Sequence, residues 1–422
     1  MFTHVPHRIV VAPSGFKESL SAVEVAEAIS AGLRRVMPGI RIDQFPVPDG
    51  GEGTVEILAQ RPEVRQYVAH VSGPVGQSVR AQWVMMAPTA QEQTAVIEMA
   101  SAAGLSLVPR EQRDPAATTT KGVGELMTAA MDEGATRIIV GCGDSGTTDG
   151  GAGALYALGV RFFDEQGEIS EPTGADLRKI TRLDTSNMDP RVQNTRVELA
   201  CNMHNILCGP HGVARVFGPQ KGASAAQIEQ LSQALDHWAE LLHQELGQKF
   251  NPDYDIAQGK GSGASGGLGA GLAAIGAQPR NRFDVLLESP SAAAEPGGIP
   301  GVNDIRDELD ELIAGADLVI TAEGAIDFQT PRGKVPAEIA RRAQKTGVPV
   351  LALAGSLGDG APNVHEVGIG AIASIMAVPM PLEQAVKDAH NLLAGAAERS
   401  LRMLILGSAM AGQIRGRMGL SA

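Results

Sequence analysis

Short apolar runs alternate with amphipathic helical segments at both ends of this 422-residue chain. Such alternation is typical of a parallel sheet covered by helices. The helix expected near the N-terminus is well delimited, because Ser21 and Glu24 have the spacing of a capping box. The segments concerned are 8–11, 22–36 and 41–46 near one end, and 317–321, 336–345, 348–353, 371–376 and 382–400 near the other. They predict one α/β domain assembled from both ends of the chain.

The region between these ends has a different pattern, with polar and apolar residues in alternation. This pattern predicts antiparallel, half-exposed strands, followed by a buried strand and a long polar helix, each next to a glycine-dense stretch. The half-exposed strands are 66–72, 79–86 and 94–99, the buried strand is 138–140 and the helix is 225–246. We therefore predict a second α/β domain, residues 71–285, inserted into an outer domain of residues 1–70 and 286–422.

The chain has 35 basic and 48 acidic residues and no basic run, which argues against a nucleic-acid partner. Its longest uncharged stretches are rich in Gly, Ser or Pro, and its N-terminus lacks a basic region followed by an apolar core. We therefore expect no membrane span and no export, and predict a cytoplasmic protein. The cysteines Cys142, Cys201 and Cys208 form no pattern typical of a metal cluster or a disulfide framework.

Two polar loops follow the first two expected strands, where α/β proteins place ligand sites. The first contains Ser14 and Lys17 before a helix start, and a mobile ammonium group there favours an anion. An ordinary turn with a surface lysine is the alternative. The second contains Asp49 and Glu52 among three glycines. Asp49 could act as a general base or a magnesium ligand, although a turn beside a helix-start acid has the same pattern.

Two further loops combine glycines with charged side chains. Residues 141–153 include Asp144, Asp149 and several glycines, and bare amides beside hydroxyls and aspartates favour a phosphate and its magnesium. The other loop contains Glu323, Asp327 and Lys334. These three could hold a metal or a phosphate, or they could be solvated charges at a helix start.

No known nucleotide-binding signature is complete in these loops. Val335 follows Gly333 and Lys334, so the P-loop pattern is absent. Residues 261–266 match G-x-G-x-x-G but follow a polar stretch, so they indicate either a phosphate cradle or close helix packing. The serine elbow of hydrolases is also absent. Phosphoryl transfer is the chemistry that these loops favour, because it needs positioning, charge neutralisation and a carboxylate base.

Taken together, the loops resemble the type I glycerate kinase family. The matching segments follow the family's order to about residue 380, and their ordered set is specific although each is short. They are 12–22, 49–54, 148–153, 205–209, 216–222, 266–271, 316–321, 323–324, 326–327, 329–330, 333–334 and 353–356. The chain departs from the family pattern at Ser14, Gly15, Met203, His204, Ile206, Ala322 and Ala325. These departures affect the prediction of the substrate more than that of the reaction class.

The resemblance implies an ATP-dependent, magnesium-requiring kinase that converts D-glycerate to 2-phosphoglycerate in glyoxylate, glycolate or sugar-acid catabolism. It also implies a Rossmann-like or flavodoxin-like parallel-sheet domain split by an inserted α/β domain, with the active site in the cleft between them. A kinase of a related hydroxy acid and a 3-phosphoglycerate-forming enzyme are alternatives. Outside the kinases, the alternatives are a sugar-acid dehydrogenase or lyase and a catalytically silent sugar-acid-binding protein.

Roles for single residues follow from the matching motifs. The predicted catalytic residues are Lys17, Asp49 and Asp149, with either aspartate as the base. The predicted substrate-binding residues are Ser14, Lys17, Gly50, Gly51 and Glu52. The predicted nucleotide-binding residues are Gly150, Gly151, Gly153, Gly266, Gly267, Gly269 and Lys334. Magnesium is expected at Glu323 and Asp327, and the protein is expected to be a monomer or a homodimer.

Overall fold

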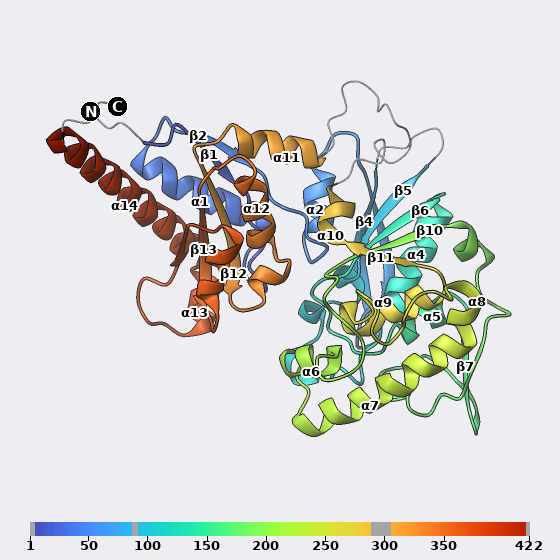
Figure 1. Cartoon of the computed structure of the whole chain (residues 1–422). Coiled ribbons are helices and arrows are strands. Elements are labelled where there is room, and N and C mark those ends of the chain that lie inside the picture. The colour runs from blue at the N-terminus through green and yellow to red at the C-terminus, as the bar shows by residue number, and fades with distance from the viewer. Residues whose placement is uncertain (1–4, 87–91, 288–304, 419–422) are drawn as a thin grey trace. The chain divides into compact units, whose positions relative to one another are not determined.

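The computed structural model describes residues 5–86, 92–287 and 305–418 (Figure 1). The chain divides into two compact units. We call Met1–Val47 with Asn303–Ala422 the split unit, and Pro48–Val302 the inserted unit. No helix within the described residues has the length and apolar character needed to cross a membrane.

The boundary of the inserted unit differs from the one expected from the sequence. Residues 48–70, assigned above to the outer domain, cluster with the inserted unit. The reason is that α2 (Thr54–Ala59) contacts β4 (Ser78–Met85) and β5 (Thr94–Glu98), while β3 (Arg65–Ser72) pairs with β4. The far boundary lies at Val302, within residues that the structure does not describe.

The split unit has a five-stranded parallel sheet, which confirms the predicted parallel α/β fold. Its strand order is β14-β13-β12-β1-β2. Counted within this unit, that is the doubly wound order 2-1-3-4-5, whose direction reverses between the first and third strands. The strands are β1 (Arg8–Val11), β2 (Arg41–Gln44), β12 (Leu318–Ile326), β13 (Val350–Leu357) and β14 (Ala371–Ser374). The loops after β1 and β12 therefore lie at the topological switch point.

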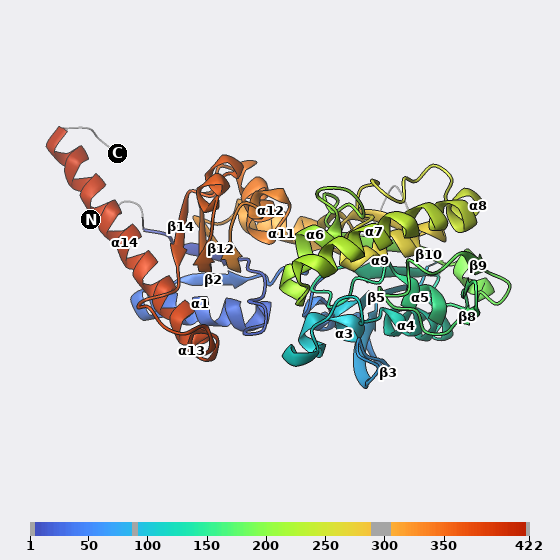
Figure 2. The same ribbon diagram turned by 90° about the horizontal axis from the view of Figure 1, so that it is seen from below.

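Helices cover both faces of this sheet. One face packs on α1 (Ala22–Val36) and α14 (Ala389–Met418), around a core that includes Ile9, Ile29 and Leu393. Gly32 lets these helices meet closely, because a Cβ there would lie 2.0 Å from the Ala394 carbonyl oxygen. Figures 1 and 2 show α14 running along α1 and extending past it. The remaining helices are α11 (Ile305–Ala314), α12 (Val335–Gln344), which contacts β12 and β13, and α13 (Leu382–Lys387).

Ser21 caps the start of α1 as the sequence predicts. Its hydroxyl accepts a hydrogen bond from the Glu24 amide, and the Glu24 carboxylate accepts one from the Ser21 amide. These reciprocal bonds satisfy two of the amides that a helix start leaves without partners.

The inserted unit has a six-stranded sheet in the order β11-β10-β6-β5-β4-β3. The strands not yet introduced are β6 (Arg137–Gly141), β10 (Arg196–Cys201) and β11 (Gln278–Asn281). The strands β5, β6, β10 and β11 are parallel, and β4 and β3 extend the sheet antiparallel. The expectation that 94–99 is half-exposed and antiparallel is wrong in part: β5 pairs antiparallel with β4 but parallel with β6, and it is buried throughout.

Helices and a small second sheet complete the inserted unit. Its apolar core joins the main sheet to these helices around Trp83, Phe162 and Trp238. Besides α2, the α-helices described in this unit are α3 (Ala100–Ala103), α4 (Lys121–Asp132), α5 (Ala152–Ala157), α6 (Val213–Phe217), α7 (Ala225–Leu242), α8 (Gln248–Phe250), α9 (Ala264–Ala274) and α10 (Arg282–Leu286). The small sheet consists of β7 (Arg161–Asp164), β8 (Gly167–Ile169) and β9 (Arg182–Asp184).

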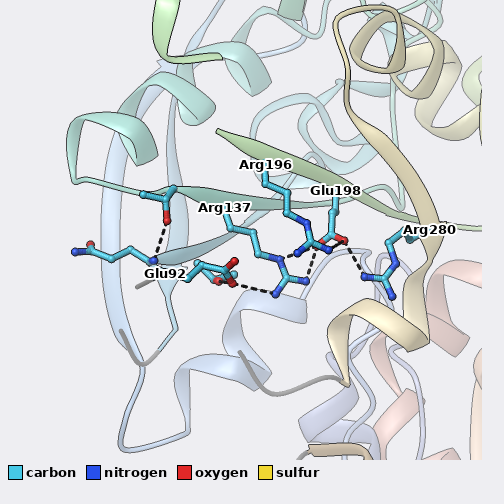
Figure 3. A network of polar contacts seen from close by, with 8 residues as sticks. Glu92, Arg137, Arg196, Glu198 and Arg280 are labelled. Carbon is cyan, nitrogen blue, oxygen red and sulfur yellow. Dashed lines mark hydrogen bonds and ion pairs between the residues drawn. The ribbon is translucent and has the colours of Figure 1, made fainter. Parts of the chain in front are cut away.

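A buried ion-pair network joins three of the parallel strands (Figure 3). The Glu198 carboxylate is fully buried and accepts hydrogen bonds from Arg137 Nε at 2.7 Å, Arg280 Nη1 at 2.8 Å and Arg196 Nη2 at 2.8 Å. Arg137 also pairs with Glu92 at 3.4 Å. Burial raises the pKa of Glu198, but the hydrogen bond from Arg280 and the charge of Arg137 outweigh it, so the pKa is lowered overall. This carboxylate is therefore ionised and holds the strands together.

Candidate active site

The loop after β1 lies against the end of β12 at the switch point of the split unit. The Ser14 amide and hydroxyl both donate to the Ala322 carbonyl oxygen, at 3.0 and 3.2 Å. Phe16 is buried, whereas Lys17 is exposed beside Gly324. Glu18 has a φ of 58°, a left-handed conformation that is uncommon for a side-chain-bearing residue. The tight turn thus brings the backbone of Lys17 next to Gly324 near the end of β12.

Glu323, Asp327 and Lys334 form one charged cluster at the end of β12. Lys334 Nζ lies 2.9 Å from Glu323 Oε1 and 3.3 Å from Asp327 Oδ1, and it donates to the Ala325 carbonyl oxygen at 3.3 Å. The structure therefore brings the two predicted magnesium ligands together, with an ammonium group bridging them. In the part of the chain described here, no three His, Cys, Asp or Glu side chains are grouped to hold a metal ion. The magnesium role of Glu323 and Asp327 stays a prediction.

The Asp49–Thr54 loop belongs to the inserted unit and is folded on itself. The Gly50 amide donates to Thr54 Oγ1 at 2.9 Å, and the Gly51 amide donates to Asp49 Oδ1 at 3.0 Å. Arg282, directly after β11, donates from Nη1 to the Asp49 carbonyl oxygen at 3.1 Å and lies 3.5 Å from Asp49 Oδ2. The Asp49 side chain keeps 29% of its surface exposed.

Two acidic side chains at the ends of neighbouring strands hold the same loop. Asp144, after β6, accepts a hydrogen bond from the Glu52 amide on Oδ2 at 3.1 Å. The φ angle of Asp144 is 52°, in the left-handed region. Glu98, the last residue of β5, accepts the Val55 amide and is 5% exposed. Burial is the main reason that the pKa of Glu98 is raised to about 8, against the lowering effect of the Val55 and Gly53 amides.

Sequence reasoning gave no role to Glu98 or Arg282 and named Asp144 only as part of a glycine-rich loop. One signal was present: Glu98 is the single charged residue in the segment 94–98 (TAVIE). A carboxylate that ends a buried strand of an α/β sheet lies at the edge where such sheets bind ligands.

Asp149 has no exposed surface, and its hydrogen bonds go to Thr120, Gly151 and Gly153 at the helix starts around it. Its Oδ2 accepts the Thr120 amide, the Thr120 hydroxyl and the Gly153 amide, at 2.7, 2.7 and 3.2 Å, and its Oδ1 accepts the Gly151 amide at 3.0 Å. Burial raises the pKa of Asp149 despite these hydrogen bonds. Its catalytic role stays a prediction, and this enclosure favours a structural role instead.

The predicted phosphate glycines pack tightly against their surroundings. A Cβ on Gly266 would lie 2.0 Å from the Thr147 carbonyl oxygen, and one on Gly150 would lie 2.4 Å from the Trp238 ring. Gly153 and Gly269 leave as little room, at 2.2 and 2.1 Å. Gly151, Gly267 and their neighbours are likewise buried. These contacts favour the close-packing interpretation of the glycine-rich segments, and a role in binding nucleotide stays a prediction.

Lys221 is a buried cation beside these glycines, and sequence reasoning gave it no role of its own. It is 2% exposed, and its Nζ donates to Ser145 Oγ at 2.8 Å and to the Thr147 carbonyl oxygen at 2.5 Å. Ser265, in the facing glycine segment, has a φ of 52°. Lys221 thus ties the loop that carries Asp144 to the segment after α6.

Both units thus carry a cluster of charged side chains at the carboxyl ends of parallel strands, where α/β proteins bind their ligands. The family model described as the glycerate kinase family matches residues 9–405, and the chain belongs to this family, whose members are kinases.

Three relatives match over most of their lengths. Glycerate kinase from Halalkalibacterium halodurans is 42% identical over 92% of this chain and 96% of its own. Glycerate kinase from Bacillus subtilis is 42% identical over 92% and 94%. Glycerate 2-kinase from Escherichia coli K12 is 39% identical over 96% and 100%.

A solved structure gives the same result. The crystal structure of a candidate glycerate kinase 2 from Salmonella typhimurium LT2 is 38% identical, covers 96% of this chain and 100% of its own, and superposes with a TM-score of 0.68. The predicted family and the predicted enzyme class are therefore confirmed.

Proposed function

We propose that this chain transfers the γ-phosphoryl group of ATP to the 2-hydroxyl of D-glycerate, giving 2-phosphoglycerate. The observation that carries the proposal is the match to glycerate kinases, one of them a glycerate 2-kinase, over nearly the whole length of each chain. The two loop clusters support it, because phosphoryl transfer relies on placed cations, carboxylates and amides.

Within the inserted unit, Asp49 is the proposed general base. Its side chain is partly exposed, and one oxygen accepts the Gly51 amide, which orients the carboxylate. Asp149 has no exposed surface through which a substrate hydroxyl could reach it, whereas 29% of the Asp49 side chain is exposed. Gly51, Glu52 and Arg282 surround Asp49 and would bind the hydroxy acid.

Within the split unit, Lys17 and Lys334 are the proposed partners of anionic oxygens. Lys17 is exposed, and Lys334 is held between two carboxylates at the switch point. Magnesium would neutralise phosphate charge when bound. The oxygen donors of Glu323 and Asp327 are of the type that Mg²⁺ prefers, so their chemistry fits the ion.

The test is ADP release from ATP and magnesium with D-glycerate, L-glycerate, tartronate and erythronate in parallel, with the product located by NMR. Turnover with D-glycerate and phosphorus coupled to the C2 proton is the expected result. Coupling to the C3 protons would indicate a 3-phosphoglycerate-forming enzyme. Thermal stabilisation by glycerate without ADP release would indicate a silent binding protein.

A further inference from the structure

We propose that Glu98 is a positioning residue of this kinase, whose carboxyl group holds the loop that carries Asp49 and Glu52 in its working geometry. The proposal rests on the proposed function, because it assigns Asp49 and Glu52 to the reaction.

Glu98 caps a helix start that is distant from it in sequence. It ends β5, between β4 and β6, and accepts the amide of Val55 from 43 residues away and that of Gly53 beside it. These amides are at the start of α2, where the N-cap residue is Gly53, with a φ of 95° and no side chain to cap the helix. A helix start needs such acceptors because its first amides have no partner within the helix.

Capping alone does not account for a buried carboxyl group. Burying an ionisable group is costly, and α2 has only six residues. A short helix is ordinarily capped by a side chain at its own N-cap position, and Gly53 has none. A capping group on the central sheet instead fixes where the loop lies relative to the strands.

Two further contacts fix the same loop to β6. Asp144 accepts the Glu52 amide, and a Cβ on Gly141 would lie 2.7 Å from the Gly50 carbonyl oxygen. Hydrogen bonds thus hold the chain at Glu52 and just after it, and Gly50 packs closely against the end of β6. Because a displacement of about 1 Å in a reacting group can cost about 10²-fold in rate, these attachments matter for catalysis.

The ionisation of Glu98 should appear in the pH dependence of activity. A purely structural role of this residue would not change that pH dependence. The negative charges of Glu52 and Asp49 also raise the pKa of this carboxyl group. In the neighbouring helices, Glu56 of α2 is exposed to solvent and α3 has no ionisable side chain. With a pKa raised to about 8, mainly by burial, the group is mostly protonated at neutral pH. At higher pH its ionisation adds a negative charge beside a loop that binds an anion, so activity should fall.

The experiment compares Glu98→Gln, Glu98→Ala and the control Glu56→Gln on the same helix. The measurements are kcat and KM for D-glycerate and for ATP from pH 6.5 to 9, with thermal unfolding of each variant. Glu98→Gln keeps an acceptor oxygen without the charge, so its kcat/KM at pH 7 should stay within about threefold of wild type while the alkaline fall near pH 8 disappears. Glu98→Ala should lose about 30-fold or more in kcat/KM. Glu56→Gln should match the wild type.

Two results would overturn the proposal: a wild-type kcat/KM in a folded Glu98→Ala, or an unchanged alkaline fall in Glu98→Gln. If Glu98→Ala does not fold, the pH profile of Glu98→Gln decides. If the wild type phosphorylates none of the acids, the proposed function has failed. Amide hydrogen exchange then tests the positioning itself. We expect the amides of Gly53 and Val55 to exchange faster in Glu98→Ala than in Glu56→Gln, and equal exchange would refute the positioning.

Discussion

Replacing Gly51 by alanine tests whether the Asp49–Thr54 loop needs its present geometry for catalysis. The added Cβ would lie 2.3 Å from Asp144 Oδ2 and 3.1 Å from Asp49 Oδ1. Ordinary contact begins at about 3.4 Å, so the Asp144 carboxylate must move by about 1 Å. That movement breaks its 3.1 Å hydrogen bond to the Glu52 amide. A shift of this size at a reacting loop should lower kcat/KM by about 10²-fold, equivalent to about 2.7 kcal/mol.

Stability should change much less than activity in this variant. The atom that must move is the end of a side chain that is not fully buried, so relaxation is easier than in a packed core. The matched control is Gly39→Ala, because that glycine is exposed and a Cβ there would meet nothing within 4 Å. Steady-state kinetics with D-glycerate and thermal unfolding are measured on both. A kcat/KM for Gly51→Ala within about threefold of the control would refute the reasoning that this loop's geometry limits the reaction.

Three other predictions follow from the contacts. Lys334→Met should lower kcat/KM by about 10²-fold or more if the ammonium contacts phosphate in the transition state, and an unchanged value in the kinetic assay would leave it a structural ion-pair partner. Asp149→Asn should destabilise the fold by about 1–3 kcal/mol, because an amide NH₂ would face a buried donor; denaturant unfolding measures this, and a stable, inactive variant would instead support a catalytic aspartate. The pKa of Glu198 is lowered in the folded state, so its stabilising contribution is present above the unfolded value of about 4.5 and is lost as the pH falls through the folded pKa. Melting curves from pH 7 to 3 should therefore show a steeper acid loss for the wild type than for Glu198→Gln, and parallel curves would contradict it.

The sequence determined the elements that depend on neighbouring residues. Apolar runs and a capping box at Ser21 predict the strands and α1 of the split unit, because periodicity and helix caps are local properties. The loops after β1 and β12 were also identifiable, because polar residues after buried strands indicate the edge where such sheets bind ligands. The ordered motifs were enough to identify the family, which the comparisons confirm.

Tertiary structure decided what each candidate residue touches. Asp49 and Asp149 look alike in the sequence, yet one is partly exposed and the other is enclosed by four hydrogen bonds. Glu98 meets the Asp49–Thr54 loop only because β5 ends beside the start of α2, 43 residues earlier in the chain. Burial and long-range hydrogen bonds set the ionisation and the freedom of a side chain, and neither can be calculated from its neighbours in sequence. The local sequence motifs thus indicate the chemistry of the family. Which acidic side chain has which role depends on how the strands and loops pack in the folded protein.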